Sequence, residues 1–113
     1  MFVNRLWKLA FGQGLVATLD DFGSQGAWPS HPDLPDWLAV EFQEGGWDVK
    51  ASLRRMLMSR AYRIASVPTE EQKHLDPTNL LVGRQNRYRL EAEMVRDNAL
   101  AVSGLLVMHL GGP

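Results

Sequence analysis

The first eleven residues carry their apolar side chains at the spacing of one helical face. These positions recur at i, i+3, i+4, i+7 and i+8, and they are Val3, Leu6, Trp7, Ala10 and Phe11. Gly12 follows where a glycine commonly ends a helix. Elsewhere in the 113 residues no segment alternates apolar and polar side chains as a half-buried strand does. The pattern therefore predicts an all-α chain that begins with a helix over residues 2–11.

Three further segments repeat this spacing and are predicted to form amphipathic helices, at residues 33–44, 48–64 and 90–108. Residues 12–32 are rich in glycine and proline, show no period, and are predicted to form a long loop. These elements fit a single helical domain, or a fragment of a larger domain, over residues 1–113. The predicted fold is therefore about four amphipathic helices with a long loop between the first two.

The predicted helix boundaries depend on capping residues. A start at Asp33 keeps Pro35 within the first turn of its helix, where the missing N–H is tolerated. Asp48 is a typical N-cap for the third helix, and Thr69 is predicted to open one short turn after it. Gly104 falls inside the predicted last helix at a cost of about 1 kcal/mol relative to alanine, and such a glycine often marks a close helix contact.

Composition excludes several classes of function. Twelve Lys and Arg against 13 Asp and Glu give a net charge of −1, so there is no basic excess for nucleic acid. The absence of cysteine excludes disulfides, thiolate zinc sites, iron–sulfur clusters and c-type haem attachment. The three histidines show no metal-ligand spacing, and no apolar run is long enough to span a membrane. We therefore expect no cofactor, no metal, no nucleic acid and no membrane span in this chain.

Charge is segregated along the chain although its sum is close to zero. Residues 20–48 contain seven acidic residues and no Lys or Arg, whereas residues 49–65 contain five basic residues and no acid. A basic helix that binds DNA is disfavoured, because the adjacent acidic segment would repel phosphates. The simpler interpretation is that the acidic segment packs beside the basic helix.

The densest polar cluster lies at the start of the predicted last helix. Arg89, Glu93, Arg96 and Asp97 follow one another at i, i+4 and i, i+3 spacing along one helical edge. Two interpretations remain open. The cluster is either an ion-pair network that locks this helix to the preceding loop, or a catalytic site in which the carboxylates perform acid–base chemistry and the arginines orient a substrate.

The long loop supplies the other candidate binding residues. Asp20 and Asp21 could bind a hard cation, although two carboxylates without further oxygen ligands are a weak signal. His31 lies at a helix start, where a local hydrogen bond is the more common role of a lone histidine. Trp28 could stack on a sugar ring. These residues stay candidate binding positions.

Several blocks of the sequence, in order, resemble a known family. They are Val-Asn-Arg-Leu-Trp at 3–7, Asp-Asp-Phe-Gly-Ser-Gln-Gly at 20–26, Asp-Pro-x-Asn at 76–79 and Arg-Leu-x-Ala-Glu-x-x-Arg-Asp at 89–97. The family is the planctomycete domain of unknown function 1553. The resemblance implies an exported, periplasmic or cell-envelope protein in which this domain lies beside companion domains, often with a planctomycete-type cytochrome c. It implies no catalytic residue.

Two function hypotheses follow from these observations. The first is a structural or interaction module of a longer protein, with self-association through apolar surface exposed around Val3, Leu6 and Trp7. Because the first helix starts without an N-cap and no companion domain is present, we expect the chain to be a fragment of such a protein. The alternative is part of an enzyme acting on extracellular polysaccharide, with the Arg/Glu/Asp cluster at its site. Whether the chain is an enzyme stays open.

Overall fold

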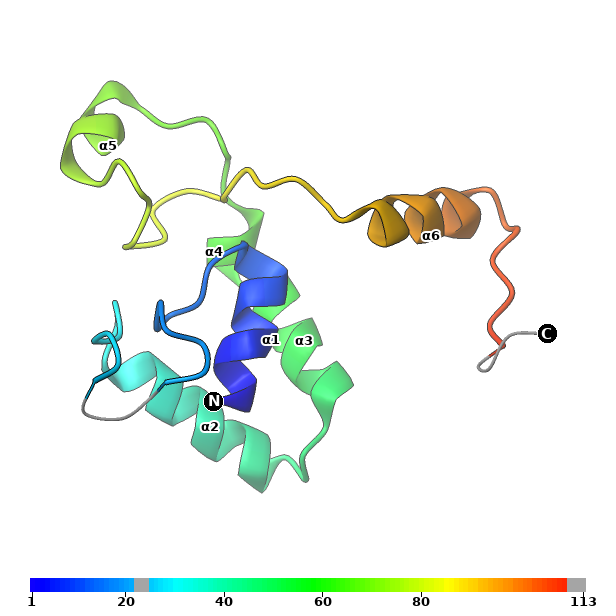
Figure 1. The fold of residues 1–113 in the computed structure, drawn as a ribbon, viewed down its shortest axis with the longest axis horizontal. Coiled ribbons are helices and arrows are strands. Elements are labelled where there is room, and N and C mark those ends of the chain that lie inside the picture. Colours follow the sequence, from blue (N-terminus) through cyan, green and yellow to red (C-terminus); the bar gives the residue numbers. More distant parts are fainter. Residues whose placement is uncertain (22–24, 110–113) are drawn as a thin grey trace.

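The computed structural model describes residues 1–21 and 25–109, so part of the 20–26 block lies outside the described residues. Within that range the secondary structure is helical without strands, which confirms the all-α prediction. The helices, shown in Figure 1, are α1 (Phe2–Phe11), α2 (Asp33–Glu44), α3 (Val49–Met58), α4 (Arg60–Arg63), α5 (Glu70–Leu75) and α6 (Ala92–Val102). The predicted ranges 2–11 and 33–44 agree with α1 and α2. None of these helices is long and apolar enough to cross a membrane.

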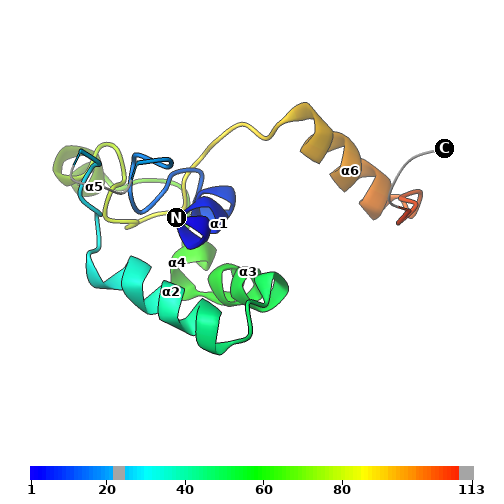
Figure 2. The same cartoon turned by 60° about the horizontal axis from the view of Figure 1, so that its bottom comes forward.

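The core forms around α1, which packs against both α2 and α3 (Figures 1 and 2). Its apolar face contributes most of the buried cluster, which consists of Val3, Leu6, Trp7, Ala10, Phe11, Leu15, Leu38, Phe42 and Met56. Trp7 and Phe11 stack with ring centroids 4.0 Å apart, and Tyr62 meets Phe11 edge-on at 5.7 Å. The helical stripe found in the sequence is therefore the centre of the core.

This burial corrects one prediction. Val3, Leu6 and Trp7 were expected to form exposed apolar surface, but they are only 6–8% exposed. The expectation was wrong because α2 and α3 cover both flanks of α1 within this chain. Any self-association must therefore use another surface.

The acidic and basic segments meet between α2 and α3. Arg55 on α3 forms an ion pair with Glu41 on α2, and its guanidinium lies 5.7 Å from the ring centroid of Trp37. Both interactions are partly exposed, so each contributes at most about 1 kcal/mol. The predicted packing of the two segments is confirmed at this contact.

The predicted helix over 48–64 is two helices. Asp48 caps α3 as expected, its carboxylate accepting from the Ala51 N–H at 2.9 Å. At Ser59 the backbone turns extended (φ −64°, ψ 153°), and the hydroxyl accepts from the Tyr62 N–H at 3.2 Å to start α4. A serine hydroxyl competes with the helical hydrogen-bond ladder in this way, which the apolar periodicity alone did not reveal. The break leaves Tyr62 in contact with Phe11.

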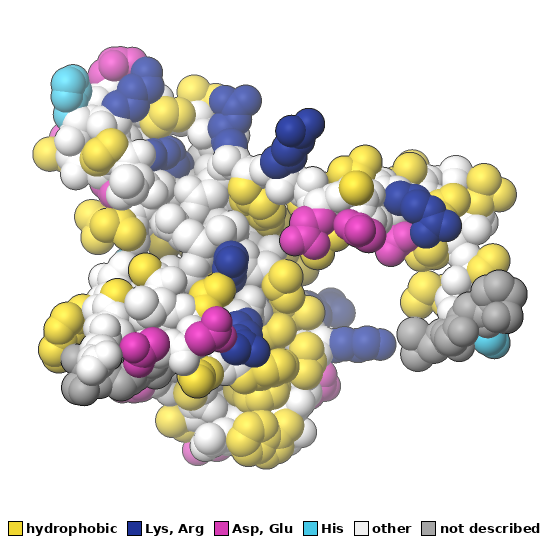
Figure 3. Space-filling model, viewed as in Figure 1, with side chains coloured by type: hydrophobic (Ala, Val, Ile, Leu, Met, Phe, Trp, Pro, Cys, Tyr) yellow, Lys and Arg dark blue, Asp and Glu magenta, His cyan; other side chains and the backbone are white. Residues whose placement is uncertain are grey.

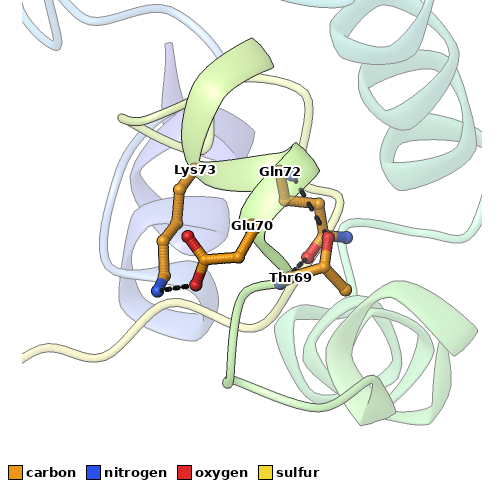
Figure 4. Close-up of polar contacts among 4 residues, drawn as sticks. All are labelled: Thr69, Glu70, Gln72 and Lys73. Atoms are coloured by element: carbon orange, nitrogen blue, oxygen red, sulfur yellow. Dashed lines mark hydrogen bonds and ion pairs between the residues drawn. The ribbon is translucent and has the colours of Figure 1, made fainter.

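A short helix follows where Thr69 was predicted to open a turn. Thr69 and Gln72 form a reciprocal capping box at the start of α5, with hydrogen bonds of 3.0 and 3.2 Å (Figure 4). Lys73 and Glu70 form an exposed ion pair at 2.6 Å on the same turn (Figure 4). The capping box satisfies backbone donors that a six-residue helix could not satisfy internally.

The last helix is shorter than the predicted range 90–108. It ends at Val102 because Gly104 adopts φ +74° and closes a C-terminal cap. The Leu105 N–H donates to the Leu100 carbonyl at 2.9 Å and the Gly104 N–H donates to the Ala101 carbonyl at 3.2 Å, which is a Schellman motif. Gly104 thus ends the helix and makes no close helix contact, since a Cβ there would meet nothing within 4 Å. Figures 1 and 2 show α6 projecting away from the other helices.

Candidate functional site

The segment that joins α5 to α6 closes the C-terminal end of α1. The last four carbonyl groups of a helix have no partner inside the helix. In α1 the Gly12 N–H donates to the Lys8 carbonyl at 2.8 Å, and the Asn86 side-chain amide donates to the Phe11 carbonyl at 2.8 Å. The Tyr88 hydroxyl lies 3.1 and 3.3 Å from the two carbonyl oxygens between them. All four carbonyls therefore have hydrogen-bond partners. Two of these partners, the Asn86 and Tyr88 side chains, come from the segment between α5 and α6.

Asn79 organises that segment. It is 1% exposed and has a φ of +57°, a left-handed conformation that asparagine tolerates better than most residues. Its side-chain amide donates to the Arg84 carbonyl at 2.8 Å and to the Asn86 side chain at 2.7 Å, and its side-chain oxygen accepts from the Arg84 N–H at 3.2 Å. Its own carbonyl accepts from the Gln13 side chain at 2.7 Å. The loop is thereby fixed both internally and to the segment after α1.

A second buried asparagine fixes the start of the long loop. The Asn4 side chain donates to the Val16 carbonyl at 2.9 Å and accepts from the Val16 N–H at 3.1 Å. Gly14 lies inside this contact, where a Cβ would come within 2.6 Å of the Val16 carbonyl oxygen. The bond pair holds residues 14–16 against α1 and so positions the residues that follow.

These two anchors leave a groove along the outer side of α1. It encloses about 600 Å³ and is lined by Arg5, Lys8, Leu9, Gly12, Leu19, Asp20, Tyr88, Arg89, Leu90, Glu91 and Met94. Arg5 and Asp20 form an ion pair across it. Lys8 and Arg89 form no ion pair with any side chain of residues 1–21 and 25–109. The groove therefore combines an apolar floor with cations available to an anionic group.

A smaller cavity of about 330 Å³ continues from this groove and shares Lys8, Gly12 and Leu19 with it. Trp28 and Ser30 also line it. Trp28 is 90% exposed, the highest value of the four tryptophans. A planar ring in this position can stack on a flat or sugar-like ligand without moving the core.

Tyr88, which lines the groove, has a shifted pKa. Partial burial raises the pKa of its hydroxyl above the ordinary value of 10.0, and the nearby Tyr62 hydroxyl raises it further. The raised pKa keeps the hydroxyl protonated, and able to donate to the carbonyl groups of α1, to a higher pH than an ordinary tyrosine. Its role at this position is to hold the residues just before α6, which we call the root of α6 (residues 86–91), against α1.

The groove brings together some of the sequence-predicted candidates. Asp20 and Arg89 line it, and Trp28 lines the adjoining cavity. His31 lies with Nδ1 3.0 Å from the Ser30 hydroxyl, the local hydrogen bond that the sequence favoured. The Asp21 carbonyl accepts from the Thr18 hydroxyl at 2.7 Å, within the turn. The described residues hold no group of three His, Asp or Glu side chains able to bind a metal ion.

The polar cluster at the start of α6 is less connected than its spacing indicated. Arg89 precedes α6, which starts at Ala92, so Arg89 and Glu93 are not one turn apart on a helix. Among the described ion pairs the cluster contributes one, between the neighbours Arg96 and Asp97 at 3.7 Å. The predicted network that would lock this helix to the preceding loop is therefore absent from residues 1–21 and 25–109. Glu93, Arg96 and Asp97 are exposed and do not line the groove.

Sequence reasoning missed the residues that build the groove. No role was predicted for Asn79, Asn86 or Tyr88. One signal was available, because Asp-Pro-x-Asn at 76–79 contains a turn-forming aspartate and a residue suited to positive φ. Both Asp76 carboxylate oxygens indeed accept backbone N–H groups, from Leu80 and Leu81 at 2.8 Å.

The fold and the groove define a small all-α module built around one central helix. The chain belongs to the PSD1 family, described as proteins of unknown function (DUF1553), whose family model matches residues 1–113. Comparison with curated proteins and comparison with solved structures gave no match. The family assignment agrees with the resemblance found in the sequence and covers the whole chain.

Proposed function

We propose that this chain is an interaction module of a longer protein and that α6 is the element through which it docks. The observation that carries the proposal is the exposure of α6. Every residue from Ala92 to Val102 except Leu100 is exposed, and Val102 is 85% exposed. An amphipathic helix is stabilised mainly by burying its apolar face.

The residues after α6 support the same proposal. Leu105, Val107 and Met108 are all strongly exposed. Met94, Val95 and Val102 in α6 are exposed as well. Extensive exposed apolar surface marks interaction sites in soluble domains.

The family resemblance supplies the expected setting. It implies an exported, periplasmic or cell-envelope protein in which companion domains, often including a planctomycete-type cytochrome c, lie beside this module. In that setting the companion domains are the partners of α6, and the role is structural. The compact α1–α3 core would then present α6 on a fixed root at Tyr88.

The test measures amide hydrogen exchange in α6. In the dilute chain alone we expect fast exchange over 92–102, and slower exchange when companion domains are joined in the same polypeptide. A Val95→Glu/Val102→Glu variant should lose this protection, while its free energy of unfolding stays within about 0.5 kcal/mol of the wild type. If the variant instead destabilises the dilute chain as strongly as a core substitution, α6 packs within the monomer and the proposal fails.

A second candidate function has one specific observation in its favour. Asp20 and Arg89 lie in the groove, and Trp28 lies exposed in the adjoining cavity. Such a site could hold part of an extracellular polysaccharide, with Glu93, Asp97 and Arg96 acting only after α6 moves. Titrating soluble oligosaccharides while monitoring tryptophan fluorescence tests it. Trp28→Ala should abolish the change, the exposed Trp47→Ala should not, and equal responses in both variants would reject the hypothesis.

A further inference from the structure

Two segments that are far apart in the sequence form the walls of the groove along α1. The lining residues of α1 are spaced i, i+3, i+4 and i+7 and so form one stripe along its outer side, made of Arg5, Lys8, Leu9 and Gly12. The opposite wall consists of residues 88–91 in the root of α6, together with Met94 in the first turn of α6. A molecule in the groove would therefore contact the core helix and the segment that carries α6 at the same time.

The groove is lined by aliphatic side chains that are only partly covered. Leu9, Leu90 and Met94 are 56%, 44% and 45% exposed, although all three line the same groove. Figure 3 shows hydrophobic side chains open to solvent where the body of the molecule meets the start of α6. A ligand that covers them removes apolar surface from water, and a methionine adapts its shape to a flexible chain. The lining therefore favours an aliphatic ligand.

The charged side chains of the groove leave one positive charge over. The cations that line it are Arg5, Lys8 and Arg89, and the acids are Asp20 and Glu91. Arg5 and Asp20 pair with each other. Lys8 and Arg89 form no ion pair with any described side chain, and Glu91 can balance only one of these two cations. A ligand with a single negative charge would complete the balance.

We propose that the groove binds a fatty-acid anion, with its alkyl chain over the aliphatic lining and its carboxylate at the Lys8 and Arg89 cations. A wholly polar anion would leave the aliphatic lining in water, and an uncharged amphiphile would leave one cation without a partner. The volume of about 600 Å³ lies within the range of roughly 300–1,000 Å³ that is common for small-molecule sites. The proposal does not depend on which domain α6 docks against.

Isothermal titration calorimetry of the full chain with decanoate tests the proposal, at neutral pH and below the concentration at which decanoate forms micelles. We expect saturable binding of one decanoate per chain. Butyrate keeps the carboxylate but shortens the alkyl chain, and decyltrimethylammonium keeps the alkyl chain but reverses the charge. Each of these control ligands should therefore bind at least about tenfold more weakly than decanoate. The absence of saturable decanoate binding, or equally tight binding of either control ligand, overturns the proposal.

Charge reversal tests the position of the carboxylate. Lys8→Glu/Arg89→Glu should raise the dissociation constant of decanoate by about tenfold or more, because repulsion replaces attraction. Lys50→Glu/Arg54→Glu is the matched control, since it makes the same charge change at two exposed residues of α3 that do not line the groove. It should leave the dissociation constant within about twofold of the wild type. Equal weakening in both variants would mean that decanoate responds only to net charge, which overturns the proposed site.

Amide hydrogen exchange locates the bound ligand. Because the ligand would contact both walls, saturating decanoate should slow exchange at 86–91 by about threefold or more, while exchange at 70–75 in α5 stays unchanged. Leu90→Ser keeps every charge in place and should weaken both the binding and this protection, whereas the exposed Leu57→Ser on α3 should change neither. Decanoate that binds without protecting 86–91 occupies another surface and overturns the proposal.

Discussion

Helices α1 and α6 have similar lengths, yet one is the centre of the core and the other is solvated. The structure buries six of the ten residues of α1 and none of the eleven of α6. Both helices end at a glycine with left-handed φ, +81° at Gly12 and +74° at Gly104. Local sequence therefore sets where each helix forms and stops, whereas burial depends on whether another element covers it.

The C-terminal ends of α1 and α6 also differ, because one is capped from a distant part of the chain and the other is capped locally. The carbonyls at the end of α1 receive Asn86 and Tyr88 from far along the chain. Near the end of α6 the carbonyls of Ala99, Leu100 and Ala101 accept from the backbone of the next residues. A long-range cap joins α1 to the whole fold, while a local cap lets α6 exist independently of it. The contrast predicts large effects of substitution around α1 and small ones in α6.

The largest contrast should appear on removing apolar side chains. Phe11 is 1% exposed and contacts both Trp7 and Tyr62, so Phe11→Ala should lower the free energy of unfolding by about 3–5 kcal/mol. Val102→Ala in α6 should change it by less than about 0.5 kcal/mol. Urea unfolding followed by circular dichroism measures both. Similar losses from the two variants would show that α6 belongs to the core.

The second-largest loss of unfolding free energy should come from Asn79, the buried asparagine between α5 and α6. Asn79→Ala removes hydrogen bonds to Arg84 and Asn86 and places alanine at φ +57°, so we expect a loss of about 2–4 kcal/mol. Asn79→Gly keeps the φ value without strain and should lose less. The exposed Asn98→Ala in α6 is the matched control and should be nearly neutral. If the alanine and glycine variants were equally stable, backbone strain at φ +57° would not contribute to the loss.

The two capping glycines allow the same substitution at the same φ. A Cβ on Gly12 would approach the Tyr88 ring at 2.5 Å, so Gly12→Ala should cost about 2–3 kcal/mol from strain and displacement of that ring. Gly104→Ala meets nothing within 4 Å and should shorten α6 while the unfolding midpoint of the core stays unchanged. Far-ultraviolet circular dichroism with thermal unfolding separates the two results. If both variants lowered the thermal unfolding midpoint, the C-terminal ends of α1 and α6 would be energetically coupled.

Local rules made the all-α fold and much of its detail predictable from sequence. The boundaries of α1 and α2, the Asp48 cap and the Thr69 turn follow from apolar spacing and caps that act within a few residues. The break at Ser59 was not predicted, because a hydroxyl cap interrupted a pattern that stayed periodic through it. The same reliance on periodicity extended the last helix past Gly104.

Burial and the groove could not be predicted in this way. The spacing of Val3, Leu6 and Trp7 predicts one apolar helical face but does not show what covers it, because their neighbours come from α2 and α3. The groove depends on Asn86 and Tyr88 reaching Phe11, Ala10 and Leu9 across more than seventy residues of chain. A single sequence holds no record of that contact.

The smallest effect should come from Tyr88, which joins the two regions. Because burial raises its pKa in the folded chain above the ordinary value of 10.0, the unfolded chain releases the proton first as pH rises. Its contribution to stability is therefore complete below pH 10 and is lost as pH rises through the folded pKa. Tyr88→Phe should remove this part of the alkaline slope and cost about 1 kcal/mol at neutral pH, from the lost hydrogen bonds to Leu9 and Ala10.

The wild type and Tyr88→Phe are compared at each pH. Both contain the same lysines, so the titration of the lysines cancels in the difference. Tyr62→Phe should reduce the slope less, because burial is the larger cause of the raised pKa and Tyr62 the smaller. Urea unfolding midpoints between pH 7 and about 11 give the slopes. If the slope persists in Tyr88→Phe, Tyr88 does not supply it. If it disappears, ionisation of one hydroxyl loosens the root of α6 from the body, and amide exchange at 86–91 should then rise over the same pH range.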